Sequence, residues 1–347
     1  MSKEKSKETG IKELGEFGLI RHLTKDLKVV NESTQLGVGD DAAILDHGNK
    51  QIVVTTDMLT EGIHFDLIYT PLKHLGYKAV VVNLSDIYAM NATPKQITVS
   101  IAISSKFTLE MTEELYSGIK LACEKYKVDL VGGDTTASLT GMTISITAIG
   151  VAEKDELVYR NGAKNTNLIC VSGDLGGAYM GLLLMEREKK VFETNPNMQP
   201  DFKGHDYILE RHLKPEAKNN VISFLKEKGI KPTAMIDISD GLSSEILHIC
   251  QQSEVGCKLI EEKIPIDLTT SNMAEEFHMV PTVAAMNGGE DYELLFTIDV
   301  KEYDKIKDDD QISVIGHITP KNDGCYLITN ADTAVELKAQ GWNPIKG

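Results

Sequence analysis

The chain has 347 residues, which is too long for one hydrophobic core of ordinary size and predicts two domains. It carries 36 Lys and Arg against 52 Asp and Glu, and the resulting net charge of −16 disfavours nucleic acid and anionic membrane surfaces as partners. An acidic protein that handles phosphates needs metal ions to neutralise them.

The five cysteines are odd in number and scattered, and none forms a C-x-x-C pair. This usage indicates neither a disulfide framework nor a zinc site and favours a reduced, cytoplasmic setting. No segment approaches the ~20 apolar residues of a membrane span. Residues 1–10 are rich in Lys and Glu and have no signal-peptide core, so we expect a disordered tail there.

Apolar residues at helical spacing predict a short helix over Glu13–Thr24. Within Leu36–Phe65, two runs rich in Val, Ile and Leu flank a polar turn at residues 47–50, which predicts a β-hairpin. Pairing about that turn would set Asp41 opposite Thr56, and Asp40 opposite Asp57.

Three carboxylates and the hydroxyls of Thr55 and Thr56 would then meet at one strand end. Like charges at that distance require shared protons or cations. Hard oxygen ligands of this kind suit Mg²⁺ or Ca²⁺. An acidic, solvated hairpin end is an equally good interpretation of this stretch alone.

Thr70-Pro71 opens a long helix predicted over Leu72–Asn91. Asp86 lies on the same helical stripe as apolar residues that should be buried, and a buried carboxylate is costly unless it is paired or bound to metal. This position favours a functional role over a core hydrogen bond. Four apolar residues share the stripe: Leu75, Ala79, Val82 and Met90.

The first half continues with alternating strands and a helix, and the charged residues 153–156 mark a candidate domain boundary. The segment 132–136, Gly-Gly-Asp-Thr-Thr, reads as a turn after a strand, where glycines let backbone N–H groups approach an anion and Asp134 can hold a cation. Taken singly, such a turn is more often structural. The expected elements are Gln96–Ser104, Leu109–Lys125, Val128–Val131 and Thr143–Val151.

The second half has its own α/β rhythm. A glycine-rich turn at residues 173–177 lacks the G-x-G-x-x-G spacing of a dinucleotide site and is better explained by tight packing. Asp237 and Asp240 bracket a strand end and a helix start with Ser243 as N-cap, a place typical of phosphates and of ordinary capping alike. The expected elements are Leu168–Ser172, Ala178–Glu188, Glu216–Lys228, Ala234–Ile238, Ser244–Cys250, Tyr292–Ile298, Ile312–Ile318 and Tyr326–Thr329.

The chain contains no Walker A sequence and no protein-kinase signature set, so phosphate handling would rest on carboxylate-bound metal. Seven segments in chain order from Gly39 to Phe296 resemble the thiamine-monophosphate kinase family: GDDAA, TTDMLTEGIHF, NLSDIYAMNATP, GGDTT, RHLKP, IDISDGL and GGEDYELLF.

The superfamily also holds selenophosphate synthetase, aminoimidazole ribonucleotide synthetase and a hydrogenase maturation factor. Selenophosphate synthetases typically carry a reactive cysteine or selenocysteine in an N-terminal loop, whereas this chain has no cysteine before Cys123. Aminoimidazole ribonucleotide synthetases read DGVGTK where this chain reads DMLTEGIHF. The maturation factor ends in a functional cysteine, whereas this chain ends in WNPIKG. Asn91 stands where the family usually has glycine, a change at a helix end that touches no ligand.

The resemblance implies a two-domain α/β (α+β) fold. An N-terminal domain over residues 11–153, a mixed sheet with helices, would bind ATP and metal and form a homodimer. A C-terminal α/β domain would cover residues 154–347.

The resemblance also implies the site. Several Mg²⁺ ions would be held by Asp41, Thr55, Thr56, Asp57, Asp86, Asp134, Asp237 and Asp240. ATP would contact Gly133, Asp134, Arg160 and Ser239. Thiamine phosphate would contact His64, Glu290 and Trp342, and an acidic and an aromatic side chain suit the thiamine cation. Without the resemblance, Trp342 reads as surface packing of a C-terminal strand.

The implied reaction is ATP + thiamine phosphate → ADP + thiamine diphosphate, by direct in-line transfer of the γ-phosphoryl group with no catalytic side chain. Two alternatives stay open: a superfamily sibling acting on another small molecule, and a non-catalytic protein that binds divalent ions. The second lacks the D-x-[DN]-x-[DN]-G calcium loop that would support it.

Overall fold

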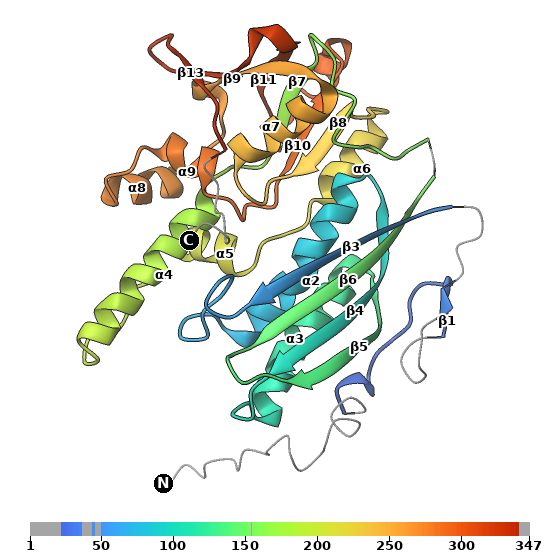
Figure 1. Ribbon diagram of the computed structural model, residues 1–347, viewed down its shortest axis with the longest axis vertical. Coiled ribbons are helices and arrows are strands. Elements are labelled where there is room, and N and C mark those ends of the chain that lie inside the picture. The colour runs from blue at the N-terminus through green and yellow to red at the C-terminus, as the bar shows by residue number, and fades with distance from the viewer. Residues whose placement is uncertain (1–21, 37–43, 46–49, 154, 340–347) are drawn as a thin grey trace. The chain divides into compact units, whose positions relative to one another are not determined.

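Figure 1 shows the computed structural model of the chain, which describes residues 22–36, 44–45, 50–153 and 155–339. The chain divides into two compact units, one of residues 1–87 with 93–151 and the other of residues 88–92 with 152–347. Each unit is described by itself. Together they form a mixed α/β protein, which confirms the predicted fold class.

The first unit is built on a four-stranded sheet in the order β3-β6-β4-β5. Strand β4 is antiparallel to β6 and parallel to β5, so the sheet is mixed as predicted. Two helices, α2 and α3, lie against one face of this sheet (Figure 1). The elements are β3 (Gln51–Thr60), α2 (Leu72–Ala89), β4 (Thr93–Ile103), α3 (Leu109–Tyr126), β5 (Asp129–Ala137) and β6 (Thr143–Ala152).

The two helices pack closely because each has a glycine at the contact. A Cβ atom at Gly76 would lie 2.0 Å from the carbonyl oxygen of Leu115, and one at Gly118 would lie 1.8 Å from that of Lys73. No larger residue fits at either position without moving a helix backbone. This contact fixes α2, which carries Asp86, over the sheet.

The predicted hairpin is wrong in the residues that the structure describes. The short strand β2 (Ile44–Leu45) pairs with β1 (Thr34–Leu36), while β3 borders β6. The buried carboxylate of Asp129 at the start of β5 explains this: it accepts hydrogen bonds from Val30 N–H (2.9 Å), Asn31 N–H (3.3 Å) and the Thr34 hydroxyl (2.7 Å), and so holds the segment before β1.

The second unit contains a seven-stranded sheet in the order β13-β12-β9-β11-β7-β10-β8. Helices α7 and α9 share a core with one face, and α6 shares a core with the other. Its strands are β7 (Leu168–Ser172), β8 (Ala234–Asp237), β9 (Val255–Ile260), β10 (Leu294–Ile298), β11 (Ile312–Pro320), β12 (Cys325–Ile328) and β13 (Ala334–Glu336). Its helices are α4 (Gly177–Thr194), α5 (Asp206–Leu213), α6 (Asn219–Glu227), α7 (Leu242–Ser253), α8 (Leu268–Glu276) and α9 (Pro281–Asn287), with 3₁₀ turns at Glu261–Lys263, Val300–Lys305 and Lys321–Asp323.

Most predicted helices and strands are present within a few residues, and two local predictions change. The segment 132–136 is part of β5 rather than a turn after it. Ser243 lies inside α7, whose N-cap is Gly241 at φ 111°. The helix expected over Glu13–Thr24 falls mostly outside the described residues, of which 22–24 are helical. No helix among the described residues is long and apolar enough to cross a membrane.

Candidate functional site

The first unit brings three predicted ligands together between β3 and α2. Alternation along β3 turns Thr55 and Asp57 toward α2, and the Thr55 hydroxyl donates a hydrogen bond to Asp86 Oδ2 at 2.6 Å. One turn earlier on α2, the buried Asn83 accepts a hydrogen bond from the Asp57 N–H at 3.0 Å and anchors its own amide on the Ala79 carbonyl. The helix and the strand are thereby held in register at the two carboxylates.

Burial and the neighbouring Asp86 raise the pKa of Asp57 to about 6, with burial the larger cause. Two half-buried carboxylates that destabilise each other's charge are stabilised by a proton or a cation. With a threonine hydroxyl beside them, they form the hard oxygen set that Mg²⁺ prefers. This pair is the strongest candidate metal site in the first unit.

Thr56 and Asp134 do not join this pair. The Thr56 hydroxyl donates to the Ile146 carbonyl (3.0 Å) and accepts from Thr147 (3.1 Å), both on β6. Asp134 is exposed on β5, the opposite edge of the sheet, about 14 Å away at three strand spacings, and accepts the Thr135 N–H at 2.9 Å.

Gly133 has a packing role. A Cβ there would lie 1.8 Å from the Val99 carbonyl oxygen of β4, so only glycine lets β5 approach at this point. The neighbouring Gly132 has no atom within 4 Å of a built Cβ and opens onto free space. The glycine pair thus has a packing reason at Gly133 and open space beside the Cα of Gly132.

His64 follows β3 in a tight turn. Its Nδ1 accepts a hydrogen bond from the Thr60 N–H at 3.0 Å, and its own N–H donates to the Thr60 carbonyl. Accepting at Nδ1 leaves the proton of the neutral ring on Nε2. The hydrogen bond at Nδ1 fixes the orientation of the ring within this turn.

The second unit gathers another acidic cluster where β8 meets α7. Asp237 is the buried last residue of β8, and Asp240 is exposed before α7. Glu245, in the first turn of α7, accepts hydrogen bonds from the Asp240 N–H (3.0 Å) and the Ser239 hydroxyl (3.4 Å). Its Oε2 is buried without a hydrogen-bond partner among the described residues. Burial, with the charges of Asp240 and Asp237, raises the pKa of Glu245 to about 8.

Glu290 lies beside this cluster. Its N–H donates to the Ser239 carbonyl at 2.7 Å, and its carboxylate approaches His212 Nδ1 at 3.1 Å. The structure therefore places the predicted ATP contact and the predicted substrate contact next to each other. Glu290 also has a positive φ of 59°, which is uncommon for a residue with a side chain.

A buried ionic network holds Asp291 and Glu293, which follow Glu290 in the chain. Arg211 pairs with Glu293 at 2.8 Å and with Asp291 at 3.5 Å, and Lys218 pairs with Glu293 at 2.6 Å. The segments RHLKP and GGEDYELLF, far apart in sequence, thus meet here. Because removal of one partner would leave a buried charge, this network fixes the loop that carries Glu290.

The remaining predicted residues have less structural support. Arg160 is exposed beside β8, and its backbone carbonyl accepts from Ser253 at 3.4 Å. Asp41, Asp40 and Trp342 lie outside the described residues.

Sequence reasoning missed Asn83 and Glu245. Asn83 precedes Asp86 by three residues, and this i, i+3 spacing on a helix was a usable signal. Glu245 stands in a helix first turn next to an acidic loop, where a glutamate that reaches back to a backbone N–H is a known arrangement.

Comparison with known proteins agrees with this geometry. Residues 39–152 match the family described as AIR synthase related protein, N-terminal domain. The match assigns the α/β fold of the first unit to the AIR synthase-related class.

Two relatives and one solved structure specify the class further. The chain is 33% identical over 341 residues to thiamine-monophosphate kinase of Bacillus subtilis (strain 168), covering 96% of this chain and 100% of the relative. It is 34% identical over 321 residues to that of Aquifex aeolicus (strain VF5), covering 90% and 98%. The structure of AaThiL complexed with AMPPCP and TMP superposes with a TM-score of 0.74 at 30% identity, covering 98% of this chain and 99% of that one. The chain therefore belongs to the thiamine-monophosphate kinase family, and it is an enzyme of the phosphate-transferring class.

Proposed function

We propose that this protein transfers the γ-phosphoryl group of ATP to thiamine phosphate, yielding thiamine diphosphate and ADP. The names of the relatives support the substrate, and AaThiL complexed with AMPPCP and TMP supports the pair of ligands. The observation that carries the proposal is the carboxylate pair of Asp57 and Asp86 with the Thr55 hydroxyl at 2.6 Å.

Several Mg²⁺ ions fit the donor set of this chain. Asp57, Asp86 and Thr55 supply one group of hard oxygens. Thr56 belongs to the proposed set, but its hydroxyl turns to β6 and lies outside this group. Asp134 lies three strand spacings, about 14 Å, from this group. That is farther than the ~4 Å over which one Mg²⁺ can bridge two oxygens, so Asp134 would hold a different ion. Asp237 and Asp240 supply a further group in the second unit, and Asp41 belongs to the proposed set. When bound, Mg²⁺ would neutralise phosphate charge that otherwise resists transfer.

The nucleotide and the acceptor are proposed to contact different residues. ATP would contact Gly133, Asp134, Arg160 and Ser239. The backbone of Gly132 and Gly133 would offer N–H donors to the phosphates, and Arg160 would offer a cation. His64 would donate from Nε2 to the phosphate of the acceptor. Glu290 and Trp342 would hold the thiamine cation by charge and by its rings.

The chemistry needs no covalent intermediate. An oxygen of the acceptor phosphate, already ionised at pH 7, forms a bond to the γ-phosphorus while the bond from that phosphorus to the bridging oxygen of ADP breaks. No general base is required because no proton leaves. The side chains position the groups in line, which is where the rate enhancement arises.

A homodimer and a cytoplasmic location complete the proposal. The face of β3 turned away from α2 carries Ile52, Val54 and Met58, with exposed fractions of 55%, 62% and 58%. An apolar sheet face of this kind suits a second copy of the N-terminal domain, residues 11–153, with the C-terminal domain at 154–347 outside that contact. All five cysteines are free thiols, which fits a reducing compartment.

The proposal is tested by incubating the purified protein with ATP, Mg²⁺ and either thiamine phosphate or thiamine, and by separating the products. We expect thiamine diphosphate and ADP in equal amounts from thiamine phosphate only, because the proposed site assigns no residue as a base that would activate a hydroxyl. Efficient turnover of thiamine would contradict the mechanism. ATP turnover with another acceptor would favour a superfamily sibling, and metal binding without turnover would favour a non-catalytic protein.

A further inference from the structure

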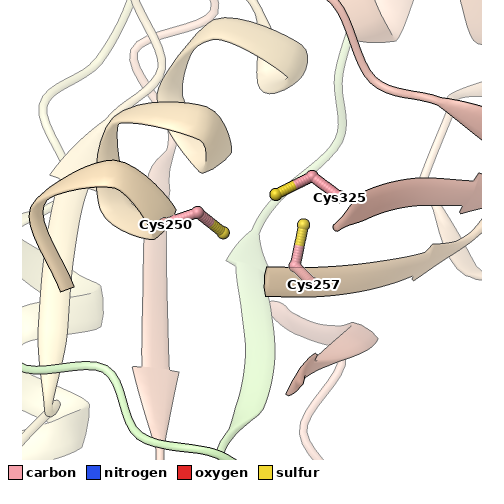
Figure 2. Close-up of side chains that lie close together, drawn as sticks. All are labelled: Cys250, Cys257 and Cys325. Atoms are coloured by element: carbon pink, nitrogen blue, oxygen red, sulfur yellow. The ribbon is translucent and has the colours of Figure 1, made fainter. Parts of the chain in front are cut away.

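Three cysteines that are scattered in the sequence meet in the second unit. Cys250 comes from α7, Cys257 from β9 and Cys325 from β12, and their sulfur atoms all lie within 4.8 Å of one another (Figure 2). All three are free thiols. The sequence spacing gave no indication of this group, because 68 residues separate Cys257 from Cys325.

The backbone fixes the two strand cysteines side by side. Parallel pairing of β9 with β12 sets Cys257 directly opposite Cys325, and the Cys257 N–H donates to the Gly324 carbonyl at 3.0 Å. A glycine precedes each cysteine. A Cβ at Gly256 would lie 2.3 Å from the Gly324 carbonyl oxygen, so the strands approach this closely only because Gly256 has no side chain.

The third thiol comes from the opposite layer. Cys250 lies in the last turn of α7, where the Glu254 N–H caps the Cys250 carbonyl, and it is 3% exposed. Cys257 is fully buried in the same apolar core, and Cys325 is half-buried at its edge. The group is therefore apolar on one side and open on the side of Cys325.

The electrostatics of the group differ from those of isolated buried thiols. Hydrogen bonds among the three thiols lower the pKa of Cys325, and the same hydrogen bonds together with burial raise the pKa of Cys257 and of Cys250. The lone Cys170, buried in β7, has a raised pKa from burial alone. Three sulfurs that converge within 4.8 Å are soft ligands for a metal ion.

We propose that Cys250, Cys257 and Cys325 bind a soft metal ion of the Zn²⁺ or Cu(I) type, which clamps the C-terminal end of α7 to β9 and β12. Zinc–thiolate bonds of about 2.3 Å in tetrahedral geometry place sulfurs about 3.8 Å apart, within the spacing of this group. Zn²⁺ suits the charge better, because three thiolates then leave −1 rather than the −2 left by Cu(I) in an apolar core.

The coordination number distinguishes the two ions. No His, Asp or Glu joins the three sulfurs among the described residues, so Zn²⁺ would take a water as fourth ligand at the open side of Cys325. Cu(I) would need no fourth ligand. The clamp lies at the far end of the helix whose first turn carries Glu245, so it is separate from the proposed phosphate chemistry.

The test uses the full chain, reduced with a phosphine under anaerobic conditions and freed of metal. It is titrated in separate arms with Zn²⁺ and Cu(I) against chromophoric chelators. We expect one ion per chain with a shell of three sulfurs at about 2.3 Å by X-ray absorption and a rise in melting temperature. Sulfur coordination distinguishes this site from carboxylate sites that also take Zn²⁺.

The variants are Cys325→Ser, which changes a half-buried thiol, and Cys250→Ala. Each should weaken sulfur-bound uptake at least 100-fold and abolish the metal-dependent rise in melting temperature. Cys170→Ala, which removes a buried thiol of the same unit outside the group, is the matched control and should bind as the wild type does. Circular dichroism verifies that each variant folds.

Absence of sulfur-bound metal in the fully reduced wild type would overturn the proposal. Equal uptake by Cys325→Ser and the wild type would also overturn it. A Cys257–Cys325 disulfide that forms in air, with no metal bound under reduction, would assign the group to redox chemistry instead.

Discussion

Asp57 and Glu245 are the two carboxylates whose surroundings most oppose ionisation at the candidate sites. Burial is the main cause for both, and neighbouring acids add to it. A group that the fold destabilises in its charged form is one that a cation stabilises. Substitution of either residue should therefore change how the stability of the protein depends on pH and on bound metal.

Asp57→Asn and Asp86→Asn should each reduce turnover at least 100-fold while leaving the fold intact. The pair holds the charge that metal would balance, and neither side chain is needed to hold apolar packing. Steady-state rates at saturating substrate concentrations test this. Glu114→Gln, on the exposed side of α3, is the control. A rate near that of the wild type in either variant would remove the residue from the metal set.

Asp57→Asn should also stabilise the metal-free protein. The folded state binds more protons than the unfolded state between about pH 4 and pH 6, so the free energy of unfolding falls through that window and stays lower above it. After allowance for solvent screening, the effect is about 1 to 2 kcal/mol. Thermal unfolding in EDTA should show the variant a few degrees more stable at pH 7.5 and no more stable at pH 4. Equal melting temperatures at pH 7.5 would contradict this.

Glu245→Gln should show the same sign in a higher window. The pKa of about 8 means that the wild type loses stability between about pH 4.5 and pH 8, a loss that glutamine, which keeps the acceptor for the Asp240 N–H, does not share. The melting temperature of the variant minus that of the wild type should therefore grow from pH 5 to pH 8.5. Glu254→Gln at the exposed end of α7 is the control. A difference that stays constant with pH would show that Glu245 is not held protonated.

At the scale of elements, β5 carries the proposed nucleotide contact away from the Asp57 pair. Asp134→Asn should therefore raise the KM for ATP more than that for thiamine phosphate, by about tenfold, because a negative ligand of the Mg²⁺–nucleotide is lost. Extra Mg²⁺ should partly restore the rate by mass action. Steady-state measurement of the KM for each substrate at several Mg²⁺ concentrations tests this prediction. A higher requirement for thiamine phosphate alone, insensitive to Mg²⁺, would mean that the two halves of the site are reversed.

The outer face of β3 gives a prediction about assembly. Val54→Asp introduces a charge into the exposed apolar row and should convert a dimer to a monomer, as measured by sedimentation equilibrium. Leu121→Asp, at an exposed position of α3, is the control and should leave the dimer unchanged. Each side chain is substantially exposed, so folding should survive. A wild-type monomer, or a Val54→Asp dimer of unchanged strength, would exclude this face as the interface.

Element prediction succeeded where local periodicity decides the structure and failed where distant residues do. The apolar stripe of α2 was sufficient to place Leu72–Ala89. The hairpin failed because Asp129, about 95 residues away, anchors β1. Ser243 was misread as a cap because Gly241 already turns the chain at positive φ. The meeting of the three cysteines depends on tertiary contacts that spacing does not encode.

At the scale of the whole molecule, the sequence motifs indicate the family, and the structure shows which residues of different motifs contact one another. The segments RHLKP and GGEDYELLF were recognisable in sequence, but only the fold shows that Arg211 and Glu293 bind each other while Glu290 lies beside Ser239. Each unit holds its own acidic cluster. Carboxylates that bind cations would let a chain with a net charge of −16 bind phosphates.

Direct transfer between the two phosphates is the central claim, and the stereochemical course at phosphorus tests it most directly. ATP made chiral at the γ-phosphorus with oxygen isotopes and sulfur is turned over with thiamine phosphate and Mg²⁺, and the configuration of the terminal group in the product is determined. A single in-line displacement predicts thiamine diphosphate with inverted configuration. Retention would require a second displacement through a covalent enzyme intermediate and would contradict the account.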